Sequence, residues 1–150
     1  KNPRVKAVKN SSMPVQDIQQ FVATGEGRIA VFNGPDEQFV AGRLMGAIGG
    51  IGGTYAAMPG LYLKADELVA SGAFEQAQAL QFTICAIIEA LCSCHGNMYA
   101  VIKELLRRKG VHCGSVRAPL APLTKDDMKQ VDACEKLIRE AEQKYILGQA

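Results

Sequence analysis

Three polar segments of this sequence contain side chains that could do chemistry. They are Lys9-Asn-Ser-Ser12, Asn33-Gly-Pro-Asp-Glu37 and Gly49-Gly-Ile-Gly-Gly-Thr54. A lysine amine that is shielded from water has a lowered pKa and becomes a usable nucleophile. Adjacent carboxylates can accept hydrogen bonds from a polyhydroxylated ligand. Glycines leave room for a substrate while their N–H groups face an anionic group.

Each of these segments also has a purely structural explanation. Most lysines lie on solvated surfaces, although strand alternation places Val5 and Ala7 on the same face as Lys9. Asp36 and Glu37 are typical of a helix start, where acidic side chains cap the first turn and interact favourably with the helix dipole. The glycine run matches neither a Walker pattern nor a dinucleotide fingerprint.

The cysteines give little indication of a metal centre. Cys92-Ser-Cys-His95 has poor zinc spacing, and Cys85 and Cys92, seven residues apart on one helix face, are expected to be small core side chains. We therefore predict no metal. Five cysteines, an odd number in a chain long enough to build a core, are typical of reduced thiols, so we expect a cytoplasmic protein.

The three polar segments follow strand-like runs. These runs cover residues 4–9, 28–33 and 47–54, and their ends are spaced 24 and 21 residues apart. Helix-period segments lie between them: the first stops at Gly25-Glu-Gly27, and the second has Asp36 as its expected N-cap. The pattern predicts β-α-β-α-β with parallel strands, whose carboxyl ends are where such folds place their chemistry.

Only helices are expected after residue 72. A long helix is expected from Phe74 up to His95-Gly96. Its stretch from Ala79 to Cys92, apolar on nearly every face, is expected to be buried or to lie in a subunit contact. Two further helices are expected to begin at the N-caps Asn97 and Thr124. A parallel sheet is covered on both faces, and the expected helices are too few to cover three strands. Either the sheet is completed elsewhere, or this chain is part of something larger.

Composition excludes several classes of protein. With 150 residues, 17 Lys plus Arg and 15 Asp plus Glu, the net charge is +2 and the length fits one domain. No basic run supports nucleic-acid binding. No membrane span is expected, because no apolar stretch is long enough. No signal peptide is expected, because the first residues lack a positive, apolar and small-residue succession.

Taken in order, the motifs resemble those of the N-acetylneuraminate lyase and dihydrodipicolinate synthase family. They are Lys-Asn-Ser-Ser, Phe-Asn-Gly-x-Asp-Glu, Gly-Gly-Ile-Gly-Gly-Thr-Tyr and Val-Arg-Ala-Pro-Leu. The resemblance covers nearly the whole chain but only the C-terminal part of the family's chain. It implies an α/β fold in which residues 1–72 supply strand–helix units 6–8 of a (β/α)8 barrel and residues 73–150 the C-terminal three-helix extension. A barrel of about 250 residues would leave about 100 to be supplied.

The resemblance also implies a mechanism and a site. Lys9 matches the lysine with which this family forms a Schiff base to pyruvate, and no other cofactor is implied. The family's pyruvate-carboxylate turn and tyrosine proton shuttle lie outside the matched part. The motifs look most like the sialic acid lyase branch, in which the matching substrate-binding residues are Ser11, Gly34, Asp36, Glu37, Ile51 and Gly53.

Two departures and two alternatives accompany this assignment. Gly53 stands where that branch commonly has a serine, and Pro35 where an aromatic is common. The expected substrate is sialic acid or another aldol of a 2-keto acid, and the expected partners are the N-terminal part of the barrel and further copies in a homotetramer, with neither nucleic acid nor membrane. The alternatives are dihydrodipicolinate synthase or another pyruvate aldolase, and a non-catalytic half-barrel.

Overall fold

The computed structural model describes residues 2–149, with side chains for 2–148. The described chain divides into two compact units. Unit 1 comprises residues 2–52 and 65–81, and unit 2 comprises residues 53–64 and 82–149.

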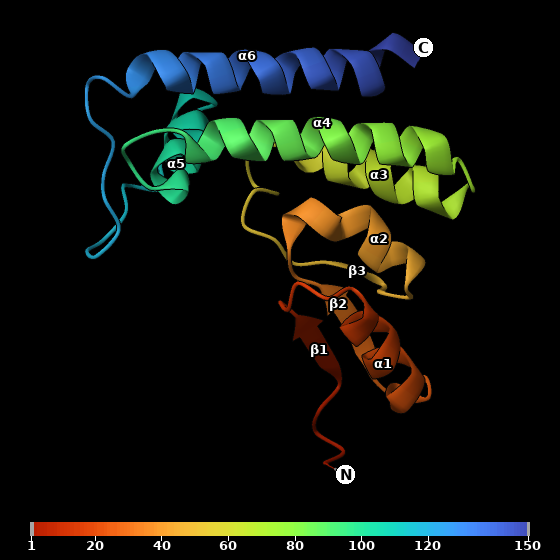
Figure 1. The fold of residues 1–150 in the computed structure, drawn as a ribbon. Coiled ribbons are helices and arrows are strands. Elements are labelled where there is room, and N and C mark those ends of the chain that lie inside the picture. Colours follow the sequence, from red (N-terminus) through yellow and green to blue (C-terminus); the bar gives the residue numbers. More distant parts are fainter. Residues whose placement is uncertain (1, 150) are drawn as a thin grey trace. The chain divides into compact units, whose positions relative to one another are not determined.

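Unit 1 contains a small parallel sheet with the strand order β1-β2-β3 (Figure 1). The strands are β1 (Ala7–Asn10), β2 (Ala30–Asn33) and β3 (Gly49–Gly50). Asn10 lies opposite Asn33, and Asn33 lies opposite Gly50, so the carboxyl ends of all three strands share one edge. The predicted parallel β-α-β-α-β arrangement is confirmed.

The first helix, α1 (Gln16–Gly25), covers this sheet through a small apolar core. Ile18, Val31 and Ala47 are almost fully buried together, with Val8 and Val15 packed against them. The helix ends where predicted, because Glu26 and Gly27 both adopt left-handed backbone conformations, with φ of 48° and 72°.

The second crossover differs from the prediction at its start. A 3₁₀ turn, η1 (Asp36–Gln38), precedes α2 (Phe39–Leu44), and neither element has a side-chain cap from its own N-cap residue. The prediction that Asp36 caps this helix is therefore wrong. The third strand is also shorter than the run over 47–54, because glycines contribute no packing side chain to a ladder.

Helix α3 (Pro59–Ala70) was not predicted from the sequence. Pro59-Gly60 resembles a turn signal, yet proline is favoured at the first position of a helix, where its missing N–H needs no partner. The buried side chains of α3 lie at helical spacing and would have revealed it: Leu61, Tyr62, Ala65 and Leu68.

The longest helix, α4 (Phe74–Cys92), begins where it was expected but ends before the predicted stop at His95-Gly96, and it is not buried on every face. Leu80, Ile84 and Leu91 are fully buried, whereas Phe82 is 67% exposed. Cys92 is likewise exposed, so the expectation that it fills the core is wrong; the buried cysteine is Cys134. No helix within residues 2–149 combines the length and apolarity needed to cross a bilayer.

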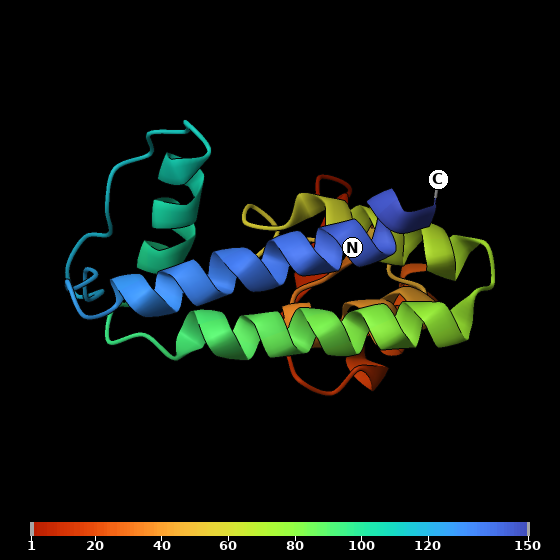
Figure 2. The same cartoon turned by 90° about the horizontal axis from the view of Figure 1, so that it is seen from above.

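Unit 2 contains the end of α4 together with α5 (Met98–Arg108), α6 (Met128–Tyr145) and the turn η2 (Leu147–Gln149). Helix α6 runs antiparallel to the unit 2 part of α4 (Figure 2). The Thr83 and Tyr145 hydroxyls are 3.0 Å apart, and Gln130 Nε2 donates to the carbonyl of Ala90.

One of the two predicted caps in this unit is correct. The Asn97 side chain accepts a hydrogen bond from the Tyr99 N–H, so Asn97 caps α5. Thr124 does not cap α6, which begins four residues later at Met128. Instead the Asp127 carboxylate accepts bonds from both the N–H (2.7 Å) and the hydroxyl (2.9 Å) of Thr124.

Asp127 also joins the α4–α5 loop to the start of α6. Its side chain is buried, and its oxygens accept bonds from the N–H groups of His95 (2.7 Å) and Gly96 (3.3 Å). The bond from the Thr124 N–H is the strongest of the contacts that hold the pKa of Asp127 well below its usual range. Because the folded-state pKa is lowered, this carboxylate stabilises the fold above its unfolded pKa of about 3.9 and loses that effect as pH falls below it.

We therefore expect Asp127→Asn to lower the melting temperature by several degrees at pH 7, because an amide replaces an acceptor of four hydrogen bonds. The difference from wild type should shrink at pH 3, because Asp127 of the unfolded chain then begins to take up a proton and its charge contributes less to the stability of the fold. Thermal melts at both pH values test this, with exposed Asp126→Asn as the matched control. A difference that stays constant between the two pH values would contradict the role of the charge.

Candidate active site at the carboxyl edge of the sheet

The ends of the three strands bring the polar segments of unit 1 together. Lys9 is the penultimate residue of β1 and pairs with Phe32 of β2. Beyond the strands, the Ile51 N–H donates to the carbonyl of Asn33 at 2.9 Å, which extends the contact between the second and third turns. One edge of the sheet therefore carries Lys9, near the end of β1, as the sequence predicts. The residues Ser11, Gly34 and Ile51 follow at the ends of neighbouring strands.

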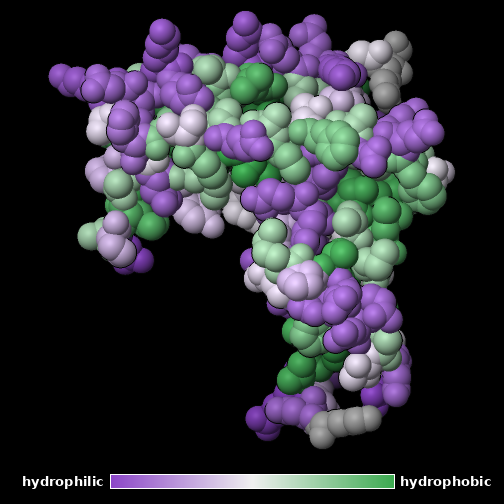
Figure 3. Space-filling view, viewed as in Figure 1, coloured by the Kyte–Doolittle hydropathy of each residue, from purple (hydrophilic) through white to green (hydrophobic). Residues whose placement is uncertain are grey.

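Lys9 itself is exposed, and so are its same-face neighbours Val5 and Ala7. Val5 is 51% exposed, and hydrophobic surface is visible on the β1 side of unit 1 (Figure 3). Within the described sheet, β1 pairs with β2 alone. The water-shielded environment that a nucleophilic lysine needs is not formed by residues 2–149, and strands added beside β1 would have to complete it.

The turn that follows Lys9 is held by side-chain hydrogen bonds. The Ser12 hydroxyl lies 2.6 Å from Asp17 Oδ2 and 2.8 Å from Asn10 Oδ1. Gln38 Nε2 donates to the Ser12 carbonyl at 3.2 Å. The turn after β1 is thus tied both to α1 and to the segment that carries Asp36 and Glu37.

Gly34 allows this turn to pack directly on the end of β2. A Cβ atom at position 34 would lie 2.6 Å from the Ser11 hydroxyl oxygen and closer still to the carbonyl oxygen of Asn10. Any side chain at position 34 would displace Ser11. With glycine at this position, Ser11 is exposed and lies next to backbone that carries no side chain. The glycine is needed for close approach rather than for an unusual φ.

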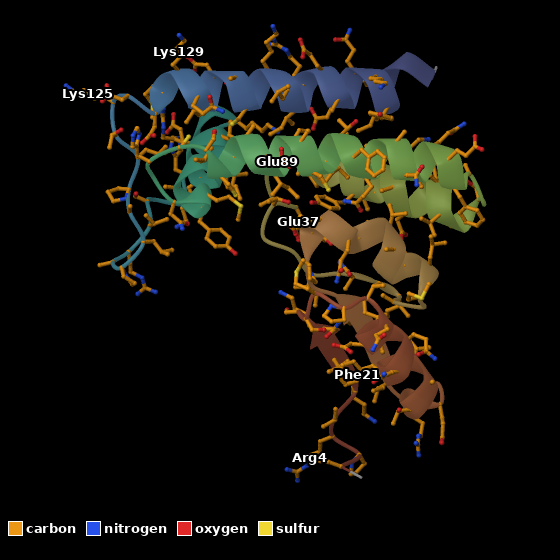
Figure 4. All side chains as sticks on the ribbon, in the orientation of Figure 1. Arg4, Phe21, Glu37, Glu89, Lys125 and Lys129 are labelled. Atoms are coloured by element: carbon orange, nitrogen blue, oxygen red, sulfur yellow. The ribbon has the colours of Figure 1, made fainter. Side chains whose placement is uncertain are left out.

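Asp36 and Glu37 begin the crossover from β2 and differ in exposure. Asp36 is 7% exposed, whereas Glu37 lies on the surface (Figure 4). Asn33 Nδ2 donates to the carbonyl of Pro35 at 2.7 Å, which fixes the turn before them. The segment after β2 therefore carries one buried and one exposed carboxylate, and Asn33 helps to fix its backbone.

Gln81 of α4 supports the segment that carries Asp36, and this contact was not predicted from the sequence. Its buried side chain accepts a hydrogen bond from the Val40 N–H at 2.9 Å and donates to the carbonyl of Asp36 at 3.1 Å. Because these partners are more than 40 residues away in the chain, no local sequence pattern could have revealed the contact.

Gly53 belongs to unit 2 and is the one predicted site residue outside unit 1. A Cβ atom at this position would lie 2.8 Å from the Tyr99 hydroxyl oxygen. The space beside Gly53 is therefore occupied by the Tyr99 ring, which is itself 45% exposed. This close approach is a physical reason for glycine here.

No three His, Cys, Asp or Glu side chains within the described residues are arranged to hold a metal ion. The groups that gather at the edge of unit 1 are an amine, a hydroxyl and two carboxylates. This set can form a covalent bond to a carbonyl carbon through the amine and accept hydrogen bonds from hydroxyl groups through the carboxylates.

Several known proteins are similar to this chain in sequence and structure. The chain is 50% identical over 147 residues to N-acetylneuraminate lyase of Mediterraneibacter gnavus, which covers 97% of this chain and 47% of the relative. The wild-type sialic acid aldolase of Ruminococcus gnavus superposes with a TM-score of 0.94 at 50% identity, covering 97% of this chain and 48% of that one. Its catalytic lysine mutant superposes equally well, at 49% identity and the same coverage. The chain thus spans about half the length of the relatives it matches.

The fold that this likeness supports is an α/β fragment with a small parallel sheet and helices. The sequence model of the dihydrodipicolinate synthetase family matches residues 1–138, which is most of the chain. The sequence match, the superposition and the parallel strands with their shared carboxyl edge agree. The chain therefore belongs to the dihydrodipicolinate synthetase family.

Proposed function

We propose that this chain is the C-terminal part of a pyruvate-dependent aldolase that cleaves N-acetylneuraminate into N-acetylmannosamine and pyruvate. The observation that carries the proposal is the position of Lys9, at the carboxyl edge of a parallel sheet whose neighbouring strand leads into Asp36 and Glu37. The 50% identity to an N-acetylneuraminate lyase supports the substrate. The Ruminococcus gnavus aldolase has a catalytic lysine, which supports a lysine mechanism here.

In the proposed reaction the Lys9 amine attacks the keto carbon of the open-chain sugar acid and water leaves, which gives an iminium. The iminium accepts the electron pair of the breaking carbon–carbon bond, while a base takes the proton from the neighbouring hydroxyl as the aldehyde forms. The resulting enamine takes up a proton, and water then releases pyruvate and the free amine. The group that moves the hydroxyl proton is expected from the N-terminal part of the barrel.

Within this enzyme, residues 1–72 are assigned to strand–helix units 6–8 of the (β/α)8 barrel and residues 73–150 to the C-terminal helical extension. Lys9 is the catalytic residue, and no cofactor beyond the covalent link to pyruvate is required. The assigned substrate-binding residues are Ser11, Gly34, Asp36, Glu37, Ile51 and Gly53.

The rest of the barrel is larger than barrel length alone indicates. The matched 147 residues make up 47% of the M. gnavus relative, so the unmatched part exceeds them, whereas about 100 residues were expected from the length of a barrel. The difference arises because this chain includes a helical extension that does not belong to the eight strand–helix units. We assign the assembled enzyme to the cytoplasm and expect a homotetramer.

A second candidate, an aldolase for another aldehyde, is favoured by one observation. The Tyr99 ring fills the space beside Gly53, so this position offers a tyrosine hydroxyl nearby rather than a side chain of its own. A change of polar group at a substrate contact alters which aldehyde binds well.

The proposal is tested by combining this chain with the N-terminal half of the family's barrel and assaying pyruvate release from N-acetylneuraminate. We expect activity from the assembled barrel and none from either half alone. The N-terminal half lacks Lys9, and in this chain alone the Lys9 side chain is exposed to water. Tight association of the halves and a larger assembly by light scattering should accompany activity. A monodisperse 16.1 kDa monomer of this chain that does not bind the other half would contradict the proposal.

A further inference from the structure

The segment Asp36–Val40, called here the carboxylate turn, carries both acids of the candidate site and is bonded to residues distant in the chain. It comprises the 3₁₀ turn η1 and the first residues of α2. Neither Pro35 nor Gln38, the N-cap positions of these elements, provides a capping side chain. The first N–H groups of a helix need acceptors from outside the helix, so a group on another element can set the position of this segment.

Gln81 provides that group. Its amide oxygen accepts from the Val40 N–H in the first turn of α2, and its amide nitrogen donates to the carbonyl of Asp36. The two bonds, of 2.9 and 3.1 Å, hold the two ends of the carboxylate turn. Gln81 is 8% exposed, so both bonds are largely shielded from water.

The chemistry of this contact requires an amide. One backbone partner is a donor and the other an acceptor, and only a side chain with both functions can serve them together. An ionised glutamate would keep the acceptor but lose the donor, and methionine of similar length would lose both. We propose that Gln81 is a positioning residue that sets the carboxylate turn, and thereby the affinity for the hydroxyl-rich end of the substrate, without touching the substrate.

This inference rests on the proposed function, in which Asp36 and Glu37 bind that end of the sugar acid. In the assembled barrel, we expect Gln81→Met to raise KM for N-acetylneuraminate about tenfold, the effect of losing one or two hydrogen bonds at a buried site. Borohydride trapping of pyruvate should be unchanged. Condensation of pyruvate with a short aldehyde that lacks hydroxyl groups should also proceed at the wild-type rate, because this substrate does not need the carboxylate turn.

The pH dependence of KM in the variant Gln81→Glu distinguishes a positioning role from a merely structural one. A carboxyl group in this buried place has a raised pKa, and in its protonated form it can again donate to the Asp36 carbonyl. Its KM for N-acetylneuraminate, taken relative to wild type at each pH, should fall as pH is lowered, whereas the ratio for Gln81→Met should stay constant. Gln78→Met, on the exposed face of the same helix, is the matched control and should behave as wild type.

The outcomes separate this inference from the proposed function. If folded Gln81 variants bind N-acetylneuraminate normally while Asp36→Ala and Glu37→Ala do not, Gln81 has no positioning role and the proposed function stands. Equal losses with N-acetylneuraminate and with the short aldehyde would show a structural role and overturn the inference. If the Asp36 and Glu37 variants also fail to discriminate between the two substrates, the sugar-binding role is wrong and the inference falls with it.

Discussion

Replacing Lys9 by alanine in the assembled barrel is expected to lower kcat for N-acetylneuraminate cleavage by several orders of magnitude, the scale seen when a covalent nucleophile is removed. Without an amine at the carboxyl edge of β1, no iminium forms to accept the electron pair of the breaking bond. Lys9→Arg is expected to be equally inactive, since a guanidinium keeps its charge and is not a nucleophile at neutral pH. Steady-state pyruvate release measures both effects.

The matched control is Lys6→Ala, which removes an exposed lysine at the amino end of the same strand, one residue before β1 begins. It should retain wild-type kcat. Melting temperatures of the Lys9 variants should also stay close to wild type, because Lys9 is exposed and a surface lysine contributes little to stability. Appreciable turnover by folded Lys9→Ala would contradict the aldolase mechanism and leave the half-barrel without catalytic function.

The second large effect is expected at the two carboxylates. Asp36→Ala and Glu37→Ala should each lower kcat/KM for N-acetylneuraminate roughly 10- to 100-fold, the loss expected for a hydrogen bond to a charged group. Schiff-base formation with pyruvate should stay largely intact, because neither carboxylate belongs to the strand that carries Lys9. Cleavage kinetics and borohydride trapping, measured side by side, provide the comparison.

The two positions should differ in stability even if their kinetics agree. Asp36 is buried and lies in the turn that Gln81 holds, so Asp36→Ala should also lower the melting temperature, whereas Glu37→Ala on the surface should not. Asp36→Asn, which keeps the shape but removes the charge, separates packing from binding. Lower melting temperatures with unchanged kinetics in both alanine variants would mean that the two acids only stabilise the start of the helix and do not bind substrate.

Much of the sheet could be predicted because its signals are local. The apolar run before Asn33 and the regular spacing of the three strand ends indicate β-α units, and the parallel register confirms them. Knowledge that parallel strands end at one edge then predicts that Lys9, Gly34 and Ile51 lie near one another. The helix cap at Asn97 was equally local, since the cap and its donor are two residues apart.

The features that could not be predicted depend on contacts distant in sequence. Asp36 resembled an N-cap, but the first turn of α2 takes its acceptor from Gln81, so the local rule was overridden by tertiary structure. Thr124 resembled a cap because the donor and acceptor roles of Thr124 and Asp127 cannot be told apart from sequence. The glycines at 34 and 53 could be recognised as close approaches only once Ser11 and Tyr99 were seen beside them.

The central claim is that Lys9 forms the covalent bond to pyruvate, and borohydride trapping in the assembled barrel tests it most directly. Reduction of the iminium should add a lactyl-sized mass to this chain, and peptide mapping should place that mass on Lys9. The adduct should be absent from Lys9→Ala. No adduct in an assembled barrel, or an adduct that maps to Lys6 or Lys64 instead, would contradict the account.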